Sequence, residues 1–183
     1  NYFLYDVFTK EKFGGGPLSV VEIPKELEAE ISDTQLQIIA REFNLAETVF
    51  IFESDKKDIE AKLRIFSVDK ELPLAGHPTI GASTHIKATH KNVGNEFMLE
   101  LNAGPTKIEF EDERAYMSQQ PHTSRGVENL DLDLLCDSIG RDKSAINFEL
   151  PIEFSSTGLE FLIIPIKDVD ELSKVTTNAN SAY

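Results

Sequence analysis

The chain has 183 residues, of which 40% are hydrophobic and 27% are charged, and its formal net charge is −14. This length suits one large domain, or one small domain with part of a second, and the hydrophobic fraction is sufficient for a globular core. Because a surface that follows nucleic-acid phosphates needs clustered basic residues, the excess of 32 acidic over 18 basic side chains argues against a nucleic-acid partner.

Two further features of the sequence exclude classes of protein. It has no run of about 18 apolar residues, and no basic segment followed by an apolar stretch near its first residue, so we predict a cytoplasmic protein without a membrane partner. The single cysteine, Cys136, excludes an intramolecular disulfide and a zinc site built from several thiolates. We interpret it as a packing residue of a short helix.

The N-terminal part of the chain predicts a strand, a glycine turn, a second strand and a helix. Aromatic and branched residues at 2–8 indicate the first strand, and residues 18–23 indicate the second. Between them, glycines 14–16 precede a proline and leave the backbone free to take positive φ, either as a simple turn or as a loop whose N–H groups contact a ligand. Residues 32–35 form a capping box, which predicts a helix that ends near Asn44.

Glu47 is the first candidate for chemistry. It is predicted to lie between the end of that helix and an apolar strand at 49–52. A carboxylate that enters a β-core is unfavourable to bury unless it is paired or protonated, so Glu47 is a candidate acid–base group. A solvent-facing loop glutamate is the alternative that position alone favours.

The second candidate is His77, in the stretch that follows a predicted strand at 62–68. Pro78 fits the first position of a helix, because its missing N–H would have no partner there, and His77 is then the predicted N-cap. Residues 79–86 are small or weakly polar on all sides, which predicts an enclosed helix. Its N-terminus would present free N–H groups and the positive end of a dipole to a substrate carboxylate.

The rest of the chain predicts a hairpin and then a shorter, less complete set of elements. We expect strands at 96–101, 106–111 and 115–119, a linker at 121–128, a helix at 132–139 closed by Gly140, strands at 149–154 and 159–166, and a helix that begins at 168. About 60 residues follow the linker, and a domain of that size is marginal. We therefore expect a first half at 1–122 and an incomplete second half at 123–183.

Two reaction types lack support in the sequence. The four histidines, His77, His85, His90 and His122, are not paired with a glutamate in the helical spacing of a zinc site, so no metal site is predicted. Ser155 and Ser156 have no Gly-x-Ser-x-Gly pattern around them, which argues against a hydrolase triad.

Five blocks of the sequence carry a family resemblance. They are residues 6–9 with 13–18, 39–48, 63–66, 71–79 (Glu-Leu-Pro-Leu-Ala-Gly-His-Pro-Thr) and 156–159 (Ser-Thr-Gly-Leu). In this order they resemble the PhzF family of phenazine-biosynthesis proteins. The resemblance implies an α+β, diaminopimelate epimerase-like fold: two similar halves, each a curved, mostly antiparallel sheet wrapped around a central helix, with the active site between the halves.

The resemblance also implies roles for matching positions. Glu47 corresponds to the acid–base carboxylate that moves a proton between carbons of a small cyclic carboxylate, and His77 to the histidine beside it. Substrate-binding roles are implied for Gly16, Gly76, Pro78, Thr157 and Gly158. The chain would thus be an isomerase that needs no cofactor or metal, with a small-molecule substrate, and the resemblance is compatible with a homodimer.

Three departures from the family pattern leave alternatives open. Gly16 stands where the family usually has an asparagine, so a polar contact to the substrate is missing. The segment Ala75-Gly76-His77 has no cysteine, which disfavours a cysteine racemase, although a racemase with other bases stays open. The family's second-half block with an aspartate does not occur before Tyr183. The alternative function is a non-catalytic binding or interaction protein on the same fold.

Overall fold

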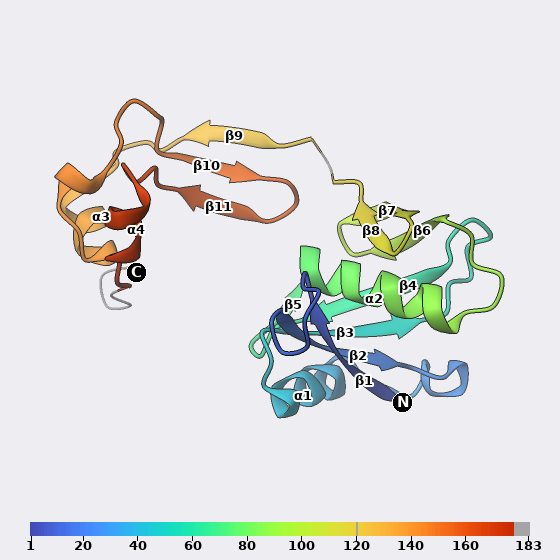
Figure 1. Cartoon of the computed structure of the whole chain (residues 1–183). Helices are drawn as coiled ribbons and strands as arrows, with labels where there is room; N and C mark the ends of the chain where they lie inside the picture. The colour runs from blue at the N-terminus through green and yellow to red at the C-terminus, as the bar shows by residue number, and fades with distance from the viewer. Residues whose placement is uncertain (120, 178–183) are drawn as a thin grey trace. The chain divides into compact units, whose positions relative to one another are not determined.

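The computed structural model describes residues 1–119 and 121–177. The chain divides into two compact units, Asn1–Gln119 and Gln120–Tyr183, which are described separately (Figure 1). The division into an epimerase-like half at 1–122 and a partial second half at 123–183 stays a prediction.

An eight-stranded sheet forms most of the first unit. Its strands are β1 (Tyr2–Val7), β2 (Gly16–Glu22), β3 (Glu47–Phe52), β4 (Ala61–Phe66), β5 (Glu71–Leu72), β6 (Glu96–Leu101), β7 (Gly104–Glu111) and β8 (Arg114–Met117). They lie in the order β1-β2-β3-β4-β6-β7-β8, with β5 beside β4. The β2/β3 and β4/β6 pairs are parallel and the other pairs are antiparallel, so the predicted mostly antiparallel sheet is confirmed.

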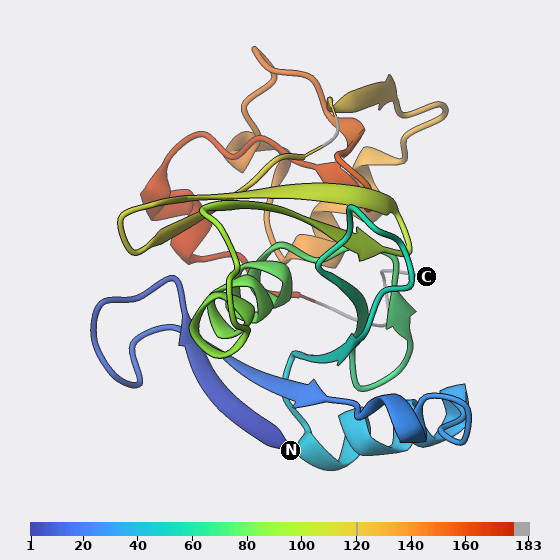
Figure 2. The same ribbon diagram turned by 90° about the vertical axis from the view of Figure 1, so that its right-hand side faces the viewer.

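Two α-helices cover opposite faces of this curled sheet. Helix α2 (Gly76–Thr89) lies inside the curve, whereas α1 (Asp33–Phe43) lies on the outside (Figures 1 and 2); a short 3-10 helix, η1, spans Lys25–Leu27. Because side chains alternate along a strand, β3 contributes to both cores. Val49 and Ile51 belong to the inner core with α2, and Phe50 and Phe52 belong to the outer core with α1.

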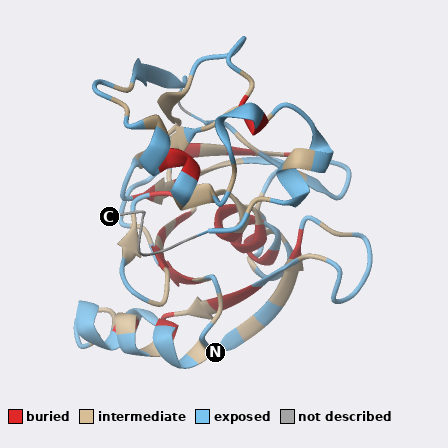
Figure 3. Cartoon of the chain, turned by 90° about the vertical axis from the view of Figure 1, so that its left-hand side faces the viewer, coloured by how far each residue is buried: buried red, intermediate tan, exposed pale blue. Residues whose placement is uncertain are grey.

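The prediction of an enclosed helix is confirmed by α2. Its buried residues are Pro78, Thr79, Gly81, Ala82, Ser83, His85 and Ile86, and much of its ribbon is red in Figure 3. Several of them are polar, and they satisfy their hydroxyls within the helix: Ser83 Oγ donates to the Thr79 carbonyl oxygen at 2.7 Å. Small side chains of this kind allow the sheet to approach the helix closely.

The predicted capping box of α1 is confirmed. The Ser32 hydroxyl accepts from the backbone N–H of Gln35 at 3.3 Å, and the Gln35 side chain accepts from the backbone N–H of Ser32 at 2.8 Å. Asn44, in the left-handed region with φ of 52°, ends the helix. The chain can therefore turn directly into β3, which begins at Glu47.

The glycine turn differs from the prediction. Positive φ occurs at Phe8 and Phe13, with values of 62° and 64°, and not at glycines 14–16. Gly15 is required for another reason, because a Cβ there would lie 2.4 Å from the carbonyl oxygen of Val7. The glycines therefore permit a close approach between two backbone segments, while two bulky residues take the conformation that glycine usually supplies.

The second unit holds a three-stranded sheet in the order β11-β10-β9. Its elements are β9 (Thr123–Gly126), α3 (Leu132–Ile139), the 3-10 helix η2 (Lys143–Ala145), β10 (Glu153–Ser156), β11 (Glu160–Ile163) and α4 (Val169–Ser173). The linker predicted at 121–128 is wrong in its centre, because residues 123–126 pair with β10. Its polar composition hid a strand whose side chains are all exposed.

The predicted end of α3 and the packing role of Cys136 are confirmed. Gly140 takes the left-handed conformation with φ of 61° after the last helical residue. Cys136 lies in a small core with Leu135 and Ile146, and burial raises the pKa of its thiol. A buried, protonated thiol is inert, as expected for a packing residue.

Candidate functional site

The side chain of Glu47 faces the inner core of the first unit. Glu47 is the first residue of β3 and is the register partner of Leu18 on β2. It alternates with Val49 and Ile51, which both belong to the core around α2, so its carboxylate enters the curve of the sheet. Its side chain is 20% exposed, and the alternative of a fully solvent-facing loop glutamate is wrong.

His77 reaches the same place from α2, although it is not the N-cap of that helix. The N-cap is Ala75, and it makes no side-chain capping bond. Pro78 is therefore the third helical residue, where a backbone N–H still has no partner within the helix, so a proline is tolerated. This shift places His77 within the first turn, and its imidazole is directed at Glu47.

Glu47 and His77 form a close but incompletely bonded pair. Oε2 of Glu47 lies 3.2 Å from Nδ1 of His77, a distance that suits an ion pair, yet the two atoms do not form a hydrogen bond. Oε2 of Glu47 and Nε2 of His77 are both buried and have no hydrogen-bond partner among the described residues. Buried polar atoms usually have hydrogen-bond partners, and one explanation for an unpartnered atom is a catalytic role.

Gly16 borders this pair. It begins β2, and a Cβ at this position would lie 3.8 Å from Cδ2 of His77. A larger side chain would therefore contact the imidazole, whereas glycine leaves that space open. A Cβ at Gly76 would meet nothing within 4 Å, so the start of α2 is also uncrowded.

The structure gathers five of the seven predicted site residues in the first unit. Glu47, His77, Gly16, Gly76 and Pro78 lie at the starts of β3, β2 and α2. Thr157 and Gly158 belong to the second unit, in the turn between β10 and β11, where the Gly158 N–H donates to Ser156 Oγ at 3.0 Å.

A charged clamp holds the segment that leads into α2, and the sequence analysis missed it. Arg64 on β4 donates to both carboxylate oxygens of Glu71 at 2.7 and 2.6 Å. Asn102 donates to the same carboxylate at 2.8 Å, and the Ala103 N–H donates to the Pro73 carbonyl at 3.0 Å. Arg64 and Glu71 lie in two of the blocks that carry the resemblance, but only the β4/β5 pairing brings them together.

This clamp predicts a pH dependence of stability. The hydrogen bonds from Arg64, opposed by burial and aided by Asn102, hold the pKa of Glu71 below its usual value. A folded-state pKa that is lowered adds stability above the unfolded pKa of about 4.3, and this stability is lost as pH falls through the folded value. We expect Glu71→Gln to lower the free energy of unfolding at pH 7, with a difference from wild type that shrinks below about pH 4.

Urea unfolding of both proteins between pH 3 and 7 measures that difference. Glu109→Gln is the matched control, because Glu109 pairs with Lys107 on the surface, where both side chains are over 40% exposed; exposed pairs contribute little. A difference between wild type and Glu71→Gln that is the same at pH 3 and pH 7 would contradict the assignment.

Neither a metal cluster nor a membrane-spanning helix occurs in the described part of the chain. Among residues 1–119 and 121–177, no three His, Cys, Asp or Glu side chains are placed to hold a metal ion. No helix in the same residues is long and apolar enough to cross a membrane.

Comparisons with known proteins identify relatives of this chain. The family model described as "Phenazine biosynthesis-like protein" (PhzC-PhzF) matches residues 5–183. An uncharacterised isomerase of Mesorhizobium japonicum is 34% identical over 181 residues, which are 96% of this chain and 59% of the relative. The trans-2,3-dihydro-3-hydroxyanthranilate isomerase of Pseudomonas chlororaphis is 30% identical over 177 residues, which are 94% of this chain and 59% of that protein. The chain thus spans about three fifths of the length of these curated relatives.

Solved structures share the fold. A phenazine biosynthesis protein of the PhzF family from Bacillus anthracis matches 97% of this chain and 59% of its own with a TM-score of 0.79 and 26% identity. A hydroxyproline epimerase from Agrobacterium vitis matches 93% of this chain and 52% of its own with a TM-score of 0.58 and 15% identity, which shows the fold alone. The predicted α+β, epimerase-like fold is confirmed.

Proposed function

Because the chain belongs to the PhzC-PhzF family of phenazine biosynthesis-like proteins, whose curated relatives include isomerases, we propose that it forms part of an isomerase that moves a proton between carbons of a small cyclic carboxylate. Glu47 is the acid–base group of this reaction and His77 is its neighbour. The observation that carries the proposal is the half-buried Glu47–His77 pair at the start of an enclosed helix, with one buried, unpartnered polar atom on each side chain.

The proposed chemistry uses a carboxylate as the acid–base group and a helix N-terminus as the binding site for the substrate carboxylate. A carboxylate oxygen of Glu47 takes a proton from a ring carbon, and the electron pair of the broken C–H bond shifts as the ring double bond moves. Glu47 then returns the proton to another carbon, so atoms and charge balance and no other reactant is needed. Free N–H groups in the first turn of α2 support the binding of the substrate carboxylate. Gly16, Gly76, Pro78, Thr157 and Gly158 stay proposed substrate-binding residues.

The name of the Pseudomonas chlororaphis relative supplies the first substrate to test. We expect the full-length protein in D2O to isomerise trans-2,3-dihydro-3-hydroxyanthranilate, or another small cyclic carboxylate, with solvent deuterium appearing on a ring carbon. Proton NMR follows both the product and the exchange. Deuterium at the α-carbon of an amino acid would instead indicate a racemase.

A non-catalytic binding protein is the second candidate. The observation that favours it is Gly16, which offers no side chain to a ligand although a Cβ there would lie 3.8 Å from the His77 ring. Such a protein would bind cyclic carboxylates without product or exchange, so saturable binding in the absence of both would overturn the isomerase proposal.

A further inference from the structure

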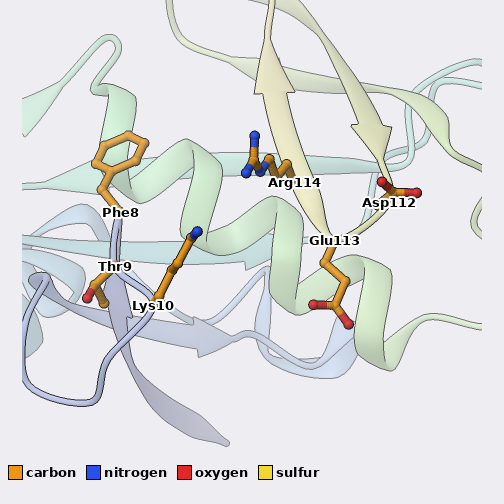
Figure 4. Close-up of a pocket in the computed structure, with 6 residues that line it drawn as sticks. All are labelled: Phe8, Thr9, Lys10, Asp112, Glu113 and Arg114. Carbon is orange, nitrogen blue, oxygen red and sulfur yellow. The ribbon is translucent and has the colours of Figure 1, made fainter.

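The open side of the curled sheet contains two adjoining hollows. The path of the sheet begins at β1 and ends at β8, so both are edge strands, and both contact α2. A hollow of about 1050 Å³ is lined by Phe8, Thr9, Lys10, Asp112, Glu113 and Arg114 (Figure 4). A second hollow, of about 500 Å³, shares four of these residues and continues down to α2. Glu47 and His77 line neither hollow.

The second hollow has the volume and the lining residues of a site for a small molecule. Its volume lies within the range of pockets for small ligands. Tyr5, Phe8 and Tyr116 supply aromatic surface, and Ile80 with Thr84 contributes surface from α2. Rings of this kind favour a flat, cyclic ligand, which can stack on them or meet their edges.

Phe8 is held over both hollows in an unusual conformation. Its φ is 62°, a value that is a true outlier for a bulky residue, and its side chain is 74% exposed. The loop after it is tied back by Asp6, whose carboxylate accepts from the Phe13 N–H at 2.8 Å. Strained residues of this kind concentrate at ligand sites, where the surrounding structure compensates for their energy.

Two cations at the mouth of the hollows lack partners. Lys10 and Arg114 are exposed, and neither forms an ion pair within 4.0 Å of an acidic side chain in the described part of the chain. Figure 4 shows Lys10 and Arg114 together with Asp112 and Glu113, and the same hollow is lined by all four residues. An anionic group of a ligand can pair there with two cations that no acidic side chain of the described residues engages.

At the α2 side of the second hollow, Tyr5 is fixed by a partly buried chain of hydrogen bonds. Its hydroxyl lies 2.7 Å from Nδ1 of His85, and Nε2 of His85 lies 3.0 Å from Oε1 of Glu22. His85 is fully buried. Because an ionised carboxylate only accepts, the tautomer that fits carries its proton on Nε2, and in this tautomer Nδ1 accepts from the Tyr5 hydroxyl. Burial, and then the charge of Glu22, raise the pKa of Tyr5, which keeps this hydroxyl protonated. The Tyr5 oxygen is thus left with lone pairs for an outside donor.

We propose that these adjoining hollows bind a small cyclic molecule whose anionic group is held by Arg114 and Lys10, and whose hydroxyl or amino group donates to the Tyr5 oxygen. This site is additional to the proposed isomerase site and does not rest on it. The sequence analysis missed it because its residues come from two strands at opposite ends of the sheet and from a helix, with no motif in common.

Binding of 4-hydroxybenzoate and of benzoate, measured by calorimetry with the full chain at pH 8, tests the proposal. Both probes carry the anion, but only the first carries a donor. We expect wild type to prefer 4-hydroxybenzoate by roughly 3- to 10-fold, as one net hydrogen bond provides. Tyr5→Phe should bind both probes with equal affinity. Its affinity for benzoate should stay that of wild type, which shows that the site is still formed.

The role of the cation is tested by Arg114→Gln, which should lower the affinity for both probes by about tenfold. Lys12→Gln, an exposed cation of the same loop that lines neither hollow, is the matched control and should bind like wild type. The proposal is overturned if wild type shows no saturable binding or no preference, if the preference survives in Tyr5→Phe, or if Arg114→Gln binds normally. Loss of binding in Glu47→Gln would also overturn it, because the probe would then occupy the other site.

Discussion

Glu47→Gln is expected to lower the rate of proton transfer by about 10³-fold, the typical contribution of a general acid–base group. Glutamine has nearly the same shape, so it fills the same place beside His77, but its amide does not accept a proton from carbon. The 3.2 Å contact between the two side chains then no longer involves a carboxylate, and the loss should appear in kcat. Deuterium exchange into the substrate, followed by NMR, measures the effect.

Glu60→Gln is the matched control for this result. Glu60 also pairs with a histidine, with 2.8 Å between Oε1 and His90 Nδ1, and its side chain is 30% exposed. This second pair lies away from the start of α2. We therefore expect the Glu60→Gln variant to exchange deuterium into the substrate at the wild-type rate. Exchange by Glu47→Gln within a factor of about three of wild type would show that Glu47 is not the base.

Gly81→Val is expected to lower the free energy of unfolding by about 3 kcal/mol, at the upper end for overpacking a core. A Cβ at Gly81 would lie 2.3 Å from Cδ2 of Leu18 and 3.0 Å from Cγ2 of Val7. Leu18 is fully buried in the inner core, so it has no free space into which to move. The helix would have to shift away from β2, and this movement would disturb the whole inner core. Urea unfolding followed by circular dichroism measures the loss.

Gly76→Ala separates this clash from the general effect of losing a glycine. Gly76 lies in the same helix, and its Cβ would meet nothing within 4 Å, so alanine there should leave stability unchanged or raise it by up to about 1 kcal/mol. If Gly81→Val were as stable as Gly76→Ala, the close approach of α2 to β2 would not contribute to stability.

The sequence predicts which residues belong to the candidate site better than it predicts how those residues are arranged. Glu47 and His77 stand out because a carboxylate enters an apolar strand and a histidine precedes a proline at a helix start. Their separation of 3.2 Å follows from the β2/β3 register and from the position of α2 inside the sheet. The prediction of His77 as the N-cap of α2 is wrong because a proline fits several positions of the first turn of a helix. Only the backbone conformation of Ala75 shows which of these positions Pro78 occupies.

The sequence by itself determined the local elements of this protein. The capping box of α1, the glycine end of α3 and the uncharged surface of α2 each depend on a few neighbouring residues, and each was found as predicted. Tertiary structure alone decided which distant side chains meet: Arg64 with Glu71 through the β4/β5 pairing, and Tyr5 with Glu22 through a buried histidine of α2. The reason is physical, since caps and turns are stabilised by groups a few residues apart, whereas the curvature of the sheet depends on strands far apart in the sequence, β1, β2, β3 and β8, that pack against one helix.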